Sequence, residues 1–343
     1  MLIINPLKPI YIDYVKQVIR MGNFKYNGKE LEYEDNDFIK IFEIAKVPIS
    51  IDNLIEKMIH KTNFSKDDIE YVIDSLKKEK FLIDYEKYQK ILEDEEINRQ
   101  NLFFSMVSDN IKNWNLDKQP KILILGLGGI GANVAMILTR AGFEKFVLVD
   151  YDIVEKSNLI RQFPYDLNDV GKPKIEILAE KLKKENVSFN LKNKKIEKCE
   201  DISKEIENSD FVICTLDKPS RIIRRIINEL CIKYKKPVIF SGFSEHIAMV
   251  GPFILPQKTA CLNCIENKNF EKNIQNVKIA PSYGPLCLLI SSIVANETIN
   301  YFTKFKKYNL IGKTMMINIL NYNKSVIKWE KNNNCEVCSN DCK

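Results

Sequence analysis

Residues 121–133 read KILILGLGGIGAN, and this stretch decides the fold. Lys121–Leu125 is apolar after its first residue, which is typical of a strand buried in a sheet. Gly126, Gly128 and Gly131 then follow with the spacing G-x-G-x-x-G, and Gly129 lies between them. Glycines let the chain turn tightly and bring backbone N–H groups to a phosphate, and the N-terminus of a following helix adds a favourable dipole. The stretch therefore predicts a turn that binds a nucleotide or a dinucleotide.

Strand-like and helix-like segments alternate after residue 120. Expected strands lie at 121–126, 145–152, 211–217 and 237–243, and expected helices at 131–141, 173–185 and 219–234. Strands alternating with helices predict a mostly parallel sheet covered by helices on both faces. The expected fold class is α/β, with a Rossmann-like sheet in the larger domain.

The first 90 residues have another pattern, which predicts a small α+β module of winged-helix type. Short strands are expected at 9–18 and 23–33, helices at 37–45, 52–61 and 65–78, and a last strand in the sequence FLIDY. Ser65 precedes the third helix and is expected to cap it. The charged, apolar-poor stretch 86–100 is interpreted as the linker. We therefore expect domains at residues 1–90 and 91–343.

Composition narrows the function classes. The net charge of the 343 residues is +6, but residues 1–95 carry 15 basic and 19 acidic side chains, which disfavours nucleic acid as a partner of the first domain. The apolar runs are too short to span a bilayer, so no membrane partner is expected. The N-terminal residues do not have the pattern of a signal peptide, and we expect a cytoplasmic protein. His60 and His246 are the only histidines, so histidine-based acid–base catalysis has little to work with.

The residues after the glycine turn separate two kinds of nucleotide chemistry. Asp150 ends the next expected strand, 19 residues after Gly131, where a carboxylate can bind ribose hydroxyl groups. The run that starts there, DYDIVEKSNLIRQ, and the lysine that follows it contain further polar candidates: Asp152, Asn158, Arg161, Gln162 and Lys174. Cations beside the phosphates suit an enzyme that breaks an α–β phosphate bond, because charge builds up on the leaving pyrophosphate. An NAD-dependent oxidoreductase has no need of them and is the less favoured alternative.

Asp217 ends the expected strand 211–217. In an open parallel sheet, the carboxyl ends of the strands face the ligand crevice. A carboxylate there suits Mg²⁺, which takes oxygen ligands together with nucleotide phosphates. Asp217 is therefore predicted to be a magnesium ligand.

Two cysteine pairs predict a metal site. Cys261 and Cys264 form CLNC, and Cys335 and Cys338 form CEVC. Four thiolates match tetrahedral zinc and leave no ligand position for water, so we expect a structural Zn²⁺ rather than a catalytic one. Reduced thiols or a redox pair are the alternative.

Together, GLGGIG, DYDIVEKSNLIRQ, VGKPK, TLD and the divided cysteine pairs resemble the ubiquitin-activating enzyme superfamily of ThiF and MoeB type, over roughly residues 95–343. The resemblance implies ATP as substrate, with Mg²⁺, and adenylation of a C-terminal carboxyl group. It places Asp150 at the ribose, Asp152 and Asn158 along the nucleotide and metal site, Arg161 and Lys174 at the phosphates, and Asp217 at Mg²⁺. The segment 97–104 is similar to the one whose arginine reaches the partner subunit's ATP, which implies a homodimer and gives that role to Arg99.

Two features narrow the resemblance to the adenylating enzymes of microcin C biosynthesis. Members that pass the activated carboxyl group to a thiol carry a cysteine after the first cysteine pair, and residues 265–286 contain none. The N-terminal module is absent from the short sulfur-carrier activators and implies a clamp for a short ribosomal peptide, with β-augmentation as the expected binding mode. The resemblance implies a peptide nucleotidyltransferase that attaches AMP to the C-terminal end of the peptide. An activator of a sulfur-carrier or ubiquitin-like protein is the alternative.

Overall fold

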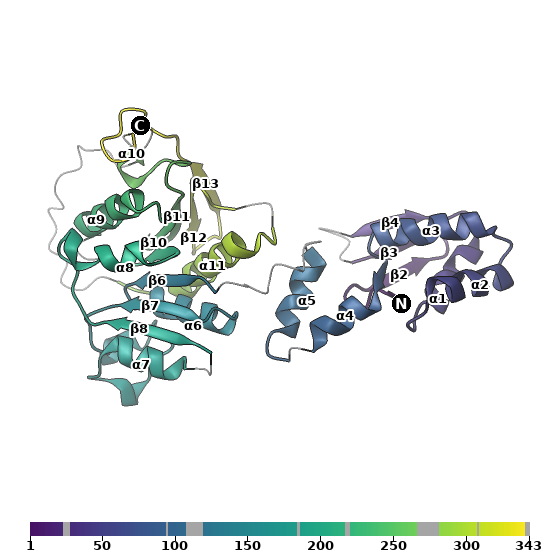
Figure 1. Ribbon diagram of the computed structural model, residues 1–343, viewed down its shortest axis with the longest axis horizontal. Coiled ribbons are helices and arrows are strands. Elements are labelled where there is room, and N and C mark those ends of the chain that lie inside the picture. Colours follow the sequence, from purple (N-terminus) through teal and green to yellow (C-terminus); the bar gives the residue numbers. More distant parts are fainter. Residues whose placement is uncertain are drawn as a thin grey trace. The chain divides into compact units, whose positions relative to one another are not determined.

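The computed structural model describes residues 1–22, 28–93, 95–107, 119–183, 186–216, 220–265, 281–306 and 309–339. The chain divides into two compact units, Met1–Ile111 and Lys112–Lys343 (Figure 1). This division falls later than the expected boundary at residue 90, because the expected linker is largely helical. It contains α4 (Tyr85–Leu92) and α5 (Asn98–Val107), which pack against each other. The Asp84 side chain accepts a hydrogen bond from the Lys87 backbone N–H and so caps α4.

The first unit has a small α+β fold. Its strands are β1 (Leu2–Ile4), β2 (Ile10–Asp13), β3 (Val18–Met21), β4 (Lys29–Glu32) and β5 (Leu82–Asp84), and its main helices are α1 (Lys40–Ile44), α2 (Ile51–Lys61) and α3 (Lys66–Lys78). β2, β3 and β4 form one antiparallel sheet in that order, and β1 pairs with β5. The expected strand 9–18 is wrong as a single element. The Asp13 carboxylate accepts hydrogen bonds from the N–H groups of Val15 and Lys16 and turns the chain between β2 and β3.

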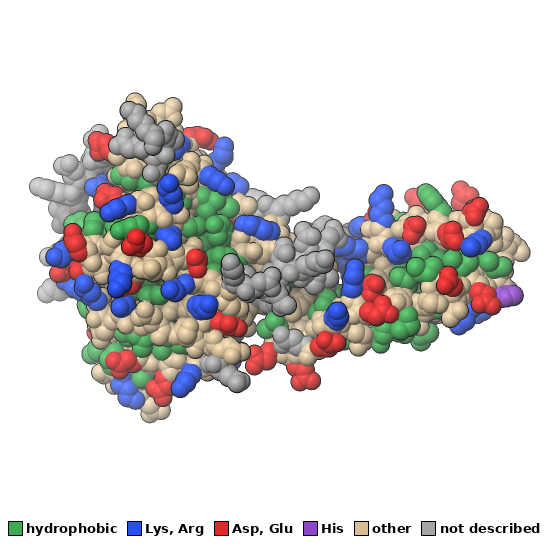
Figure 2. Space-filling model, viewed as in Figure 1, with side chains coloured by type: hydrophobic (Ala, Val, Ile, Leu, Met, Phe, Trp, Pro, Cys, Tyr) green, Lys and Arg blue, Asp and Glu red, His purple; other side chains and the backbone are tan. Residues whose placement is uncertain are grey.

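The helices of this unit pack around a common core beside a small sheet. Ile49, between α1 and α2, bridges Leu2 of β1, and β5 follows α3, so β1 joins the two segments into a small sheet. Ser65 caps α3 in a capping box with Asp68, as the sequence predicted. One side of each helix is buried in a common core that includes Phe42, Leu54, Met58, Ile69 and Ile73. Figure 2 shows acidic and basic side chains interspersed over the visible face of this unit.

The second unit is built on an eight-stranded sheet with the order β13-β12-β11-β10-β9-β6-β7-β8. These strands are β6 (Lys121–Leu125), β7 (Lys145–Val149), β8 (Ser188–Lys192), β9 (Phe211–Cys214), β10 (Val238–Ser244), β11 (Ile247–Ile254), β12 (Lys313–Asn318) and β13 (Lys324–Lys328). The strands from β8 to β10 are parallel, and β11 to β13 extend the sheet antiparallel. The α/β class and the mostly parallel sheet are confirmed, whereas the antiparallel extension was not predicted.

Helices cover both faces of this sheet. Alternate residues of the parallel strands, such as Leu123 and Val212, belong to a core with α8 (Ser203–Glu207) and α9 (Ser220–Lys233). On the other face, Phe211 packs against Tyr301 and Phe302 of α11 (Gly284–Thr303), which also contacts α6 (Gly131–Arg140). α7 (Lys174–Lys181) packs beside β8. Among the described residues, no helix has the length and apolar character needed to cross a membrane.

Candidate active site

The glycine turn joins β6 to α6 by a close approach of two backbone segments. Gly126 has a φ of +87°, in the left-handed region that favours glycine. A Cβ atom on Gly131 would lie 1.9 Å from the Gly126 carbonyl oxygen. Thr215, directly after β9, holds the turn from the other side, because its hydroxyl lies 3.1 Å from the Leu125 oxygen and 3.0 Å from the Gly126 oxygen. Gly126 and Gly131 are thus required by the backbone itself.

Gly128 offers a matched comparison, because a Cβ atom there would meet nothing closer than Gln162 Nε2 at 3.9 Å. We expect Gly131→Ala to lower the free energy of unfolding by about 2 kcal/mol or more, since the turn must open to admit the methyl group. Gly128→Ala is expected to keep wild-type stability and to weaken nucleotide binding. Urea unfolding and nucleotide titration of both variants measure the difference; equal stability of the two would contradict this account of the turn.

Asp150, at the end of β7, fixes the start of the glycine turn. Only 8% of the residue is exposed, and its two carboxylate oxygens accept hydrogen bonds from the N–H groups of Leu127 (2.6 Å) and Asp152 (2.8 Å). Burial raises the pKa of this carboxyl group, and the two backbone hydrogen bonds oppose that rise. Each oxygen keeps a second lone pair. The contact of Asp150 with the ribose therefore stays a prediction. Its role in shaping the glycine turn is shown by the two hydrogen bonds.

Lys174 and Asp152 form an ion pair next to this loop. Lys174 Nζ lies 3.0 Å from Asp152 Oδ2; the lysine side chain is buried, while 49% of the aspartate side chain is exposed. The backbone also joins them, because the Lys174 N–H donates to the Asp152 carbonyl and Ile153 forms a bridge with Pro173. The start of α7 thus holds a cation at the carboxyl end of the parallel strands. Such a charge can stabilise a departing pyrophosphate.

Arg161 and Gln162 lie against the glycine turn. A Cβ atom on Gly129 would lie 3.3 Å from Arg161 Cγ, and Arg161 Nη1 donates to the Ser157 carbonyl at 2.8 Å. Asn133 of α6 ties the two segments together by donating to the Gly129 oxygen (2.6 Å) and the Arg161 oxygen (3.3 Å). Among the described residues, Gln162 Oε1 and Asn133 Oδ1 are buried acceptors without a hydrogen-bond partner. Both oxygens lie beside the glycine turn.

The structure brings most predicted residues to one edge of the sheet. Asn158 is buried at the end of a short 3₁₀ turn, where its side-chain oxygen accepts from the Glu155 N–H at 3.1 Å. Asp217 lies outside the described residues. Arg99 belongs to α5 of the first unit and has an exposed side chain.

Sequence reasoning missed two residues that shape this edge. The role of Asn133 could not be predicted from the sequence, because a polar residue in a helical pattern is usually exposed to solvent. The role of Tyr165 could not be predicted either. Its buried hydroxyl donates to the Leu127 carbonyl at 3.2 Å, and burial raises its pKa well above the usual range.

The four predicted zinc ligands form a cluster. Their sulfur atoms lie within 4.8 Å of one another, with separations of 3.9 Å (Cys261–Cys264), 3.6 Å (Cys261–Cys335) and 3.5 Å (Cys264–Cys338). A tetrahedral zinc–thiolate site with bonds of about 2.3 Å has sulfur–sulfur edges of about 3.8 Å, so the residues fit this metal. The fit makes Zn²⁺ a proposal for this cluster.

Asn228 of α9 supports the first cysteine pair from the core. This fully buried residue accepts a hydrogen bond from the Leu262 N–H (2.9 Å) and donates one to Asn263 Oδ1 (3.0 Å). The cluster therefore joins the segment after β11 to the C-terminal segment, and Asn228 ties the segment after β11 to α9.

The glycine turn, the buried cation and the sheet edge define an α/β enzyme that handles nucleotides. The profile of the ThiF family matches residues 98–337, and the chain belongs to this family. It is 26% identical to the molybdopterin-synthase adenylyltransferase of Escherichia coli, over 72% of this chain and 98% of that protein. The sulfur carrier protein ThiS adenylyltransferase of E. coli is 29% identical, over 54% of this chain and 72% of that protein. The chain is accordingly an ATP-using nucleotidyltransferase.

Solved structures match the fold of both units. A crystal structure of E. coli MccB with ATP covers 98% of this chain and 99% of its own, with a TM-score of 0.80 and 24% identity. A crystal structure of PaaA covers 95% of this chain and 99% of its own, with a TM-score of 0.74 and 22% identity. The N-terminal unit therefore belongs to a recurrent architecture.

Proposed function

We propose that this enzyme activates the C-terminal end of a short ribosomal peptide and attaches AMP to it, with release of pyrophosphate, as in microcin C-type biosynthesis. The observation that carries the proposal is the N-terminal unit. The E. coli molybdopterin-synthase enzyme is matched over 98% of its length by 72% of this chain, so almost nothing in it corresponds to this unit. MccB, described as a microcin C7 biosynthetic enzyme and solved in complex with N-formylated MccA, is matched over 98% of this chain.

The site residues support the chemistry of the first step. A carboxylate oxygen of the peptide attacks the α-phosphorus of ATP, the α–β phosphate bond breaks, and the electron pair leaves with pyrophosphate. Lys174 and Arg161 offset the developing charge, and the N–H groups of the turn at Gly128 and Gly129 orient the phosphates. Asp150 and Gln162 hold the nucleotide. Asp217 is proposed to bind Mg²⁺, and Asp152 and Asn158 to line the nucleotide and metal site; when bound, this ion neutralises phosphate charge.

The first unit offers an edge strand for the peptide. β4 lies at one end of the order β2-β3-β4, and three of its four residues are exposed. An extended peptide can add to such an edge through backbone hydrogen bonds. We propose this edge as the track that holds the peptide.

We further propose a homodimer in which Arg99 completes the partner's site. An exposed apolar cluster beside the nucleotide site supports self-association: Ile160, Phe163 and Tyr283 are 65%, 46% and 57% exposed. They are neighbours, because a Cβ atom on Gly284 would lie 2.5 Å from the Ile160 oxygen and 3.0 Å from Phe163 Cζ. Such clusters mark interaction surfaces.

Mixing two inactive variants tests the shared site. Arg99→Ala and Lys174→Met are each expected to be inactive alone, because one removes the donated arginine and the other the resident lysine. After subunit exchange, mixed dimers contain one intact site, so activity should return to about a quarter of wild type. Pyrophosphate release is the readout. No recovery after exchange proven by differently tagged subunits would refute a shared site.

The second candidate is activation of a sulfur-carrier protein, which the sequence identity to the two E. coli adenylyltransferases favours. Product analysis separates the candidates. The enzyme is incubated with Mg-ATP and either a short peptide ending in asparagine or a sulfur-carrier protein. A stable peptide–nucleotide adduct in the mass spectrum supports the first proposal. Turnover with the carrier protein alone would replace it by the second.

A further inference from the structure

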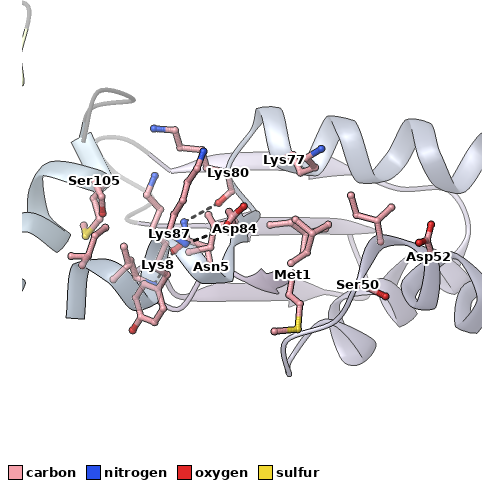
Figure 3. Close-up of a pocket in the computed structure, with 18 residues that line it drawn as sticks. Met1, Asn5, Lys8, Ser50, Asp52, Lys77, Lys80, Asp84, Lys87 and Ser105 are labelled. Carbon is pink, nitrogen blue, oxygen red and sulfur yellow. Dashed lines mark hydrogen bonds between the residues drawn. The ribbon is translucent and has the colours of Figure 1, made fainter. Parts of the chain in front are cut away.

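A pocket of about 760 Å³ lies within the first unit, in the size range of ligand sites (Figure 3). It is formed by β1, β5, the segment after β1, the start of α2, the end of α3, and α4 and α5. Its walls include apolar side chains, among them Leu7, Leu82, Ile91 and Met106. None of the functions proposed above accounts for it.

Lysines gather at one end of this pocket. Figure 3 shows Lys8, Lys80 and Lys87 close together there, with Asp84 beside them, while Asp52 lies at the opposite end. The lining also contains a fourth lysine, Lys77, which pairs with Asp74, and two aspartates. The lining of the pocket thus has more basic than acidic side chains, whereas residues 1–95 as a whole have more acidic ones.

The positions of Lys8 and Lys80 are fixed by a buried amide. Asn5 is 5% exposed; its Nδ2 donates to the Lys80 carbonyl at 2.9 Å, and its Oδ1 accepts from the Leu7 N–H at 2.9 Å. These bonds clamp the segment after β1 to the end of α3 and bring the two lysines together. Among the described residues, Lys8 forms no ion pair. Its pKa is lowered, first by burial and then by the charges of Lys80 and Lys29.

We infer that this pocket binds an acidic, apolar segment of the peptide substrate, with its carboxylates at Lys8, Lys80 and Lys87. The inference rests on the proposed peptide function and adds the charge class of the peptide. An anion at this end offsets the charges of Lys8 and Lys87, while the apolar walls take up neighbouring side chains. Lys29 begins β4, so the lysine end lies near the proposed peptide track.

The remaining charges favour spaced carboxylates over a polyphosphate. Asp84 also lines the pocket, and its carboxylate is committed to the N-cap of α4. A polyphosphate would concentrate negative charge against Asp84, whereas single carboxylates separated by apolar residues reach the lysines individually. Ser50 and Ser105 add hydroxyl groups that can bond a peptide backbone.

Fluorescence anisotropy of the full-length protein tests the inference with two labelled probes. One is an acetylated peptide of alternating leucine and glutamate, and the other has glutamine in place of each glutamate. We expect at least ~10-fold tighter binding of the glutamate probe, since charge-assisted hydrogen bonds to two lysines exceed 1.4 kcal/mol in total. The double variant Lys8→Gln/Lys80→Gln should reduce this preference to less than ~2-fold.

Matched controls keep the test decisive. Lys66→Gln removes an exposed lysine that pairs with Glu70 and does not line the pocket, and it should leave the preference unchanged. Lys8→Arg keeps the charge and should keep the preference. Equal binding of both probes to the wild type, or a preserved preference in the double variant at an unchanged melting temperature, overturns the inference. Displacement of the glutamate probe by inorganic pyrophosphate better than by unlabelled peptide would assign the pocket to phosphates and also overturn it.

Different results would refute the proposed function and the inference about the pocket. Charge-dependent probe binding without nucleotide transfer to any peptide would refute that function alone. Nucleotide transfer to acidic and neutral peptides with equal KM would refute the pocket inference alone.

Discussion

Lys174→Met is expected to lower the rate of pyrophosphate release by about 10²–10³-fold, the usual cost of removing one preorganised charge from a transition state. Lys174 is buried at the start of α7 and pairs with the half-exposed Asp152, so its ammonium group is held in place before any nucleotide binds. Methionine keeps the length and apolar stem of the side chain. The loss should therefore appear in kcat, with a smaller change in the KM for ATP.

Lys172→Gln is the matched control for this prediction. Lys172 is exposed, and its backbone carbonyl accepts from the Val154 N–H whatever the side chain is. We expect activity within about 2-fold of wild type, as for most exposed positions. Coupled phosphate detection after pyrophosphatase measures both variants. A fully active Lys174→Met enzyme would remove this residue from the catalytic site.

Cys335→Ser is expected to release most of the zinc and to lower the free energy of unfolding by about 3 kcal/mol or more, as loss of a structural metal does. Cys335 Sγ lies 3.6 Å from Cys261 Sγ, so this substitution removes one of the four sulfur ligands and one of the two close sulfur contacts between the cysteine pairs. The C-terminal segment would then lose its attachment to the turn after β11. Metal analysis and thermal unfolding of the purified variant measure the two effects.

Cys199→Ser provides the comparison, because Cys199 is half-buried and does not belong to the sulfur cluster. It should keep one zinc per chain and a melting temperature near that of wild type. Undiminished zinc in Cys335→Ser would exclude a four-cysteine site.

The parallel strands β6, β7, β9 and β10 were predictable because each contains an apolar run, as is typical of parallel strands covered on both faces. The parallel edge strand β8, with the sequence SFNLK, has no such run and was not predicted. The antiparallel strands β12 and β13 have polar, partly exposed residues and gave no such signal. The helices within residues 86–100 were not predicted, because most residues there are charged and only a few apolar residues show a helical spacing. Two of these apolar residues, Tyr88 and Ile91, line the pocket of the first unit.

The candidate site was predictable where its residues follow strand ends in the sequence. Asp150, Asp152 and Lys174 come together because β7 and α7 meet at the carboxyl edge of the sheet. Contacts between segments that are far apart in the chain could not be predicted from the sequence. A Cβ atom on Gly129 would lie 2.9 Å from Cys287 Sγ, a contact between segments far apart in the chain. Asn133 likewise gains its role only through the carbonyl of Arg161.

The fate of the ATP phosphates tests the central claim most directly. The enzyme is incubated with a peptide ending in asparagine and with ATP labelled at either the α- or the γ-phosphate. We expect the α label in the peptide product and the γ label in pyrophosphate. Release of the γ label as orthophosphate, with no label on the peptide, would contradict it.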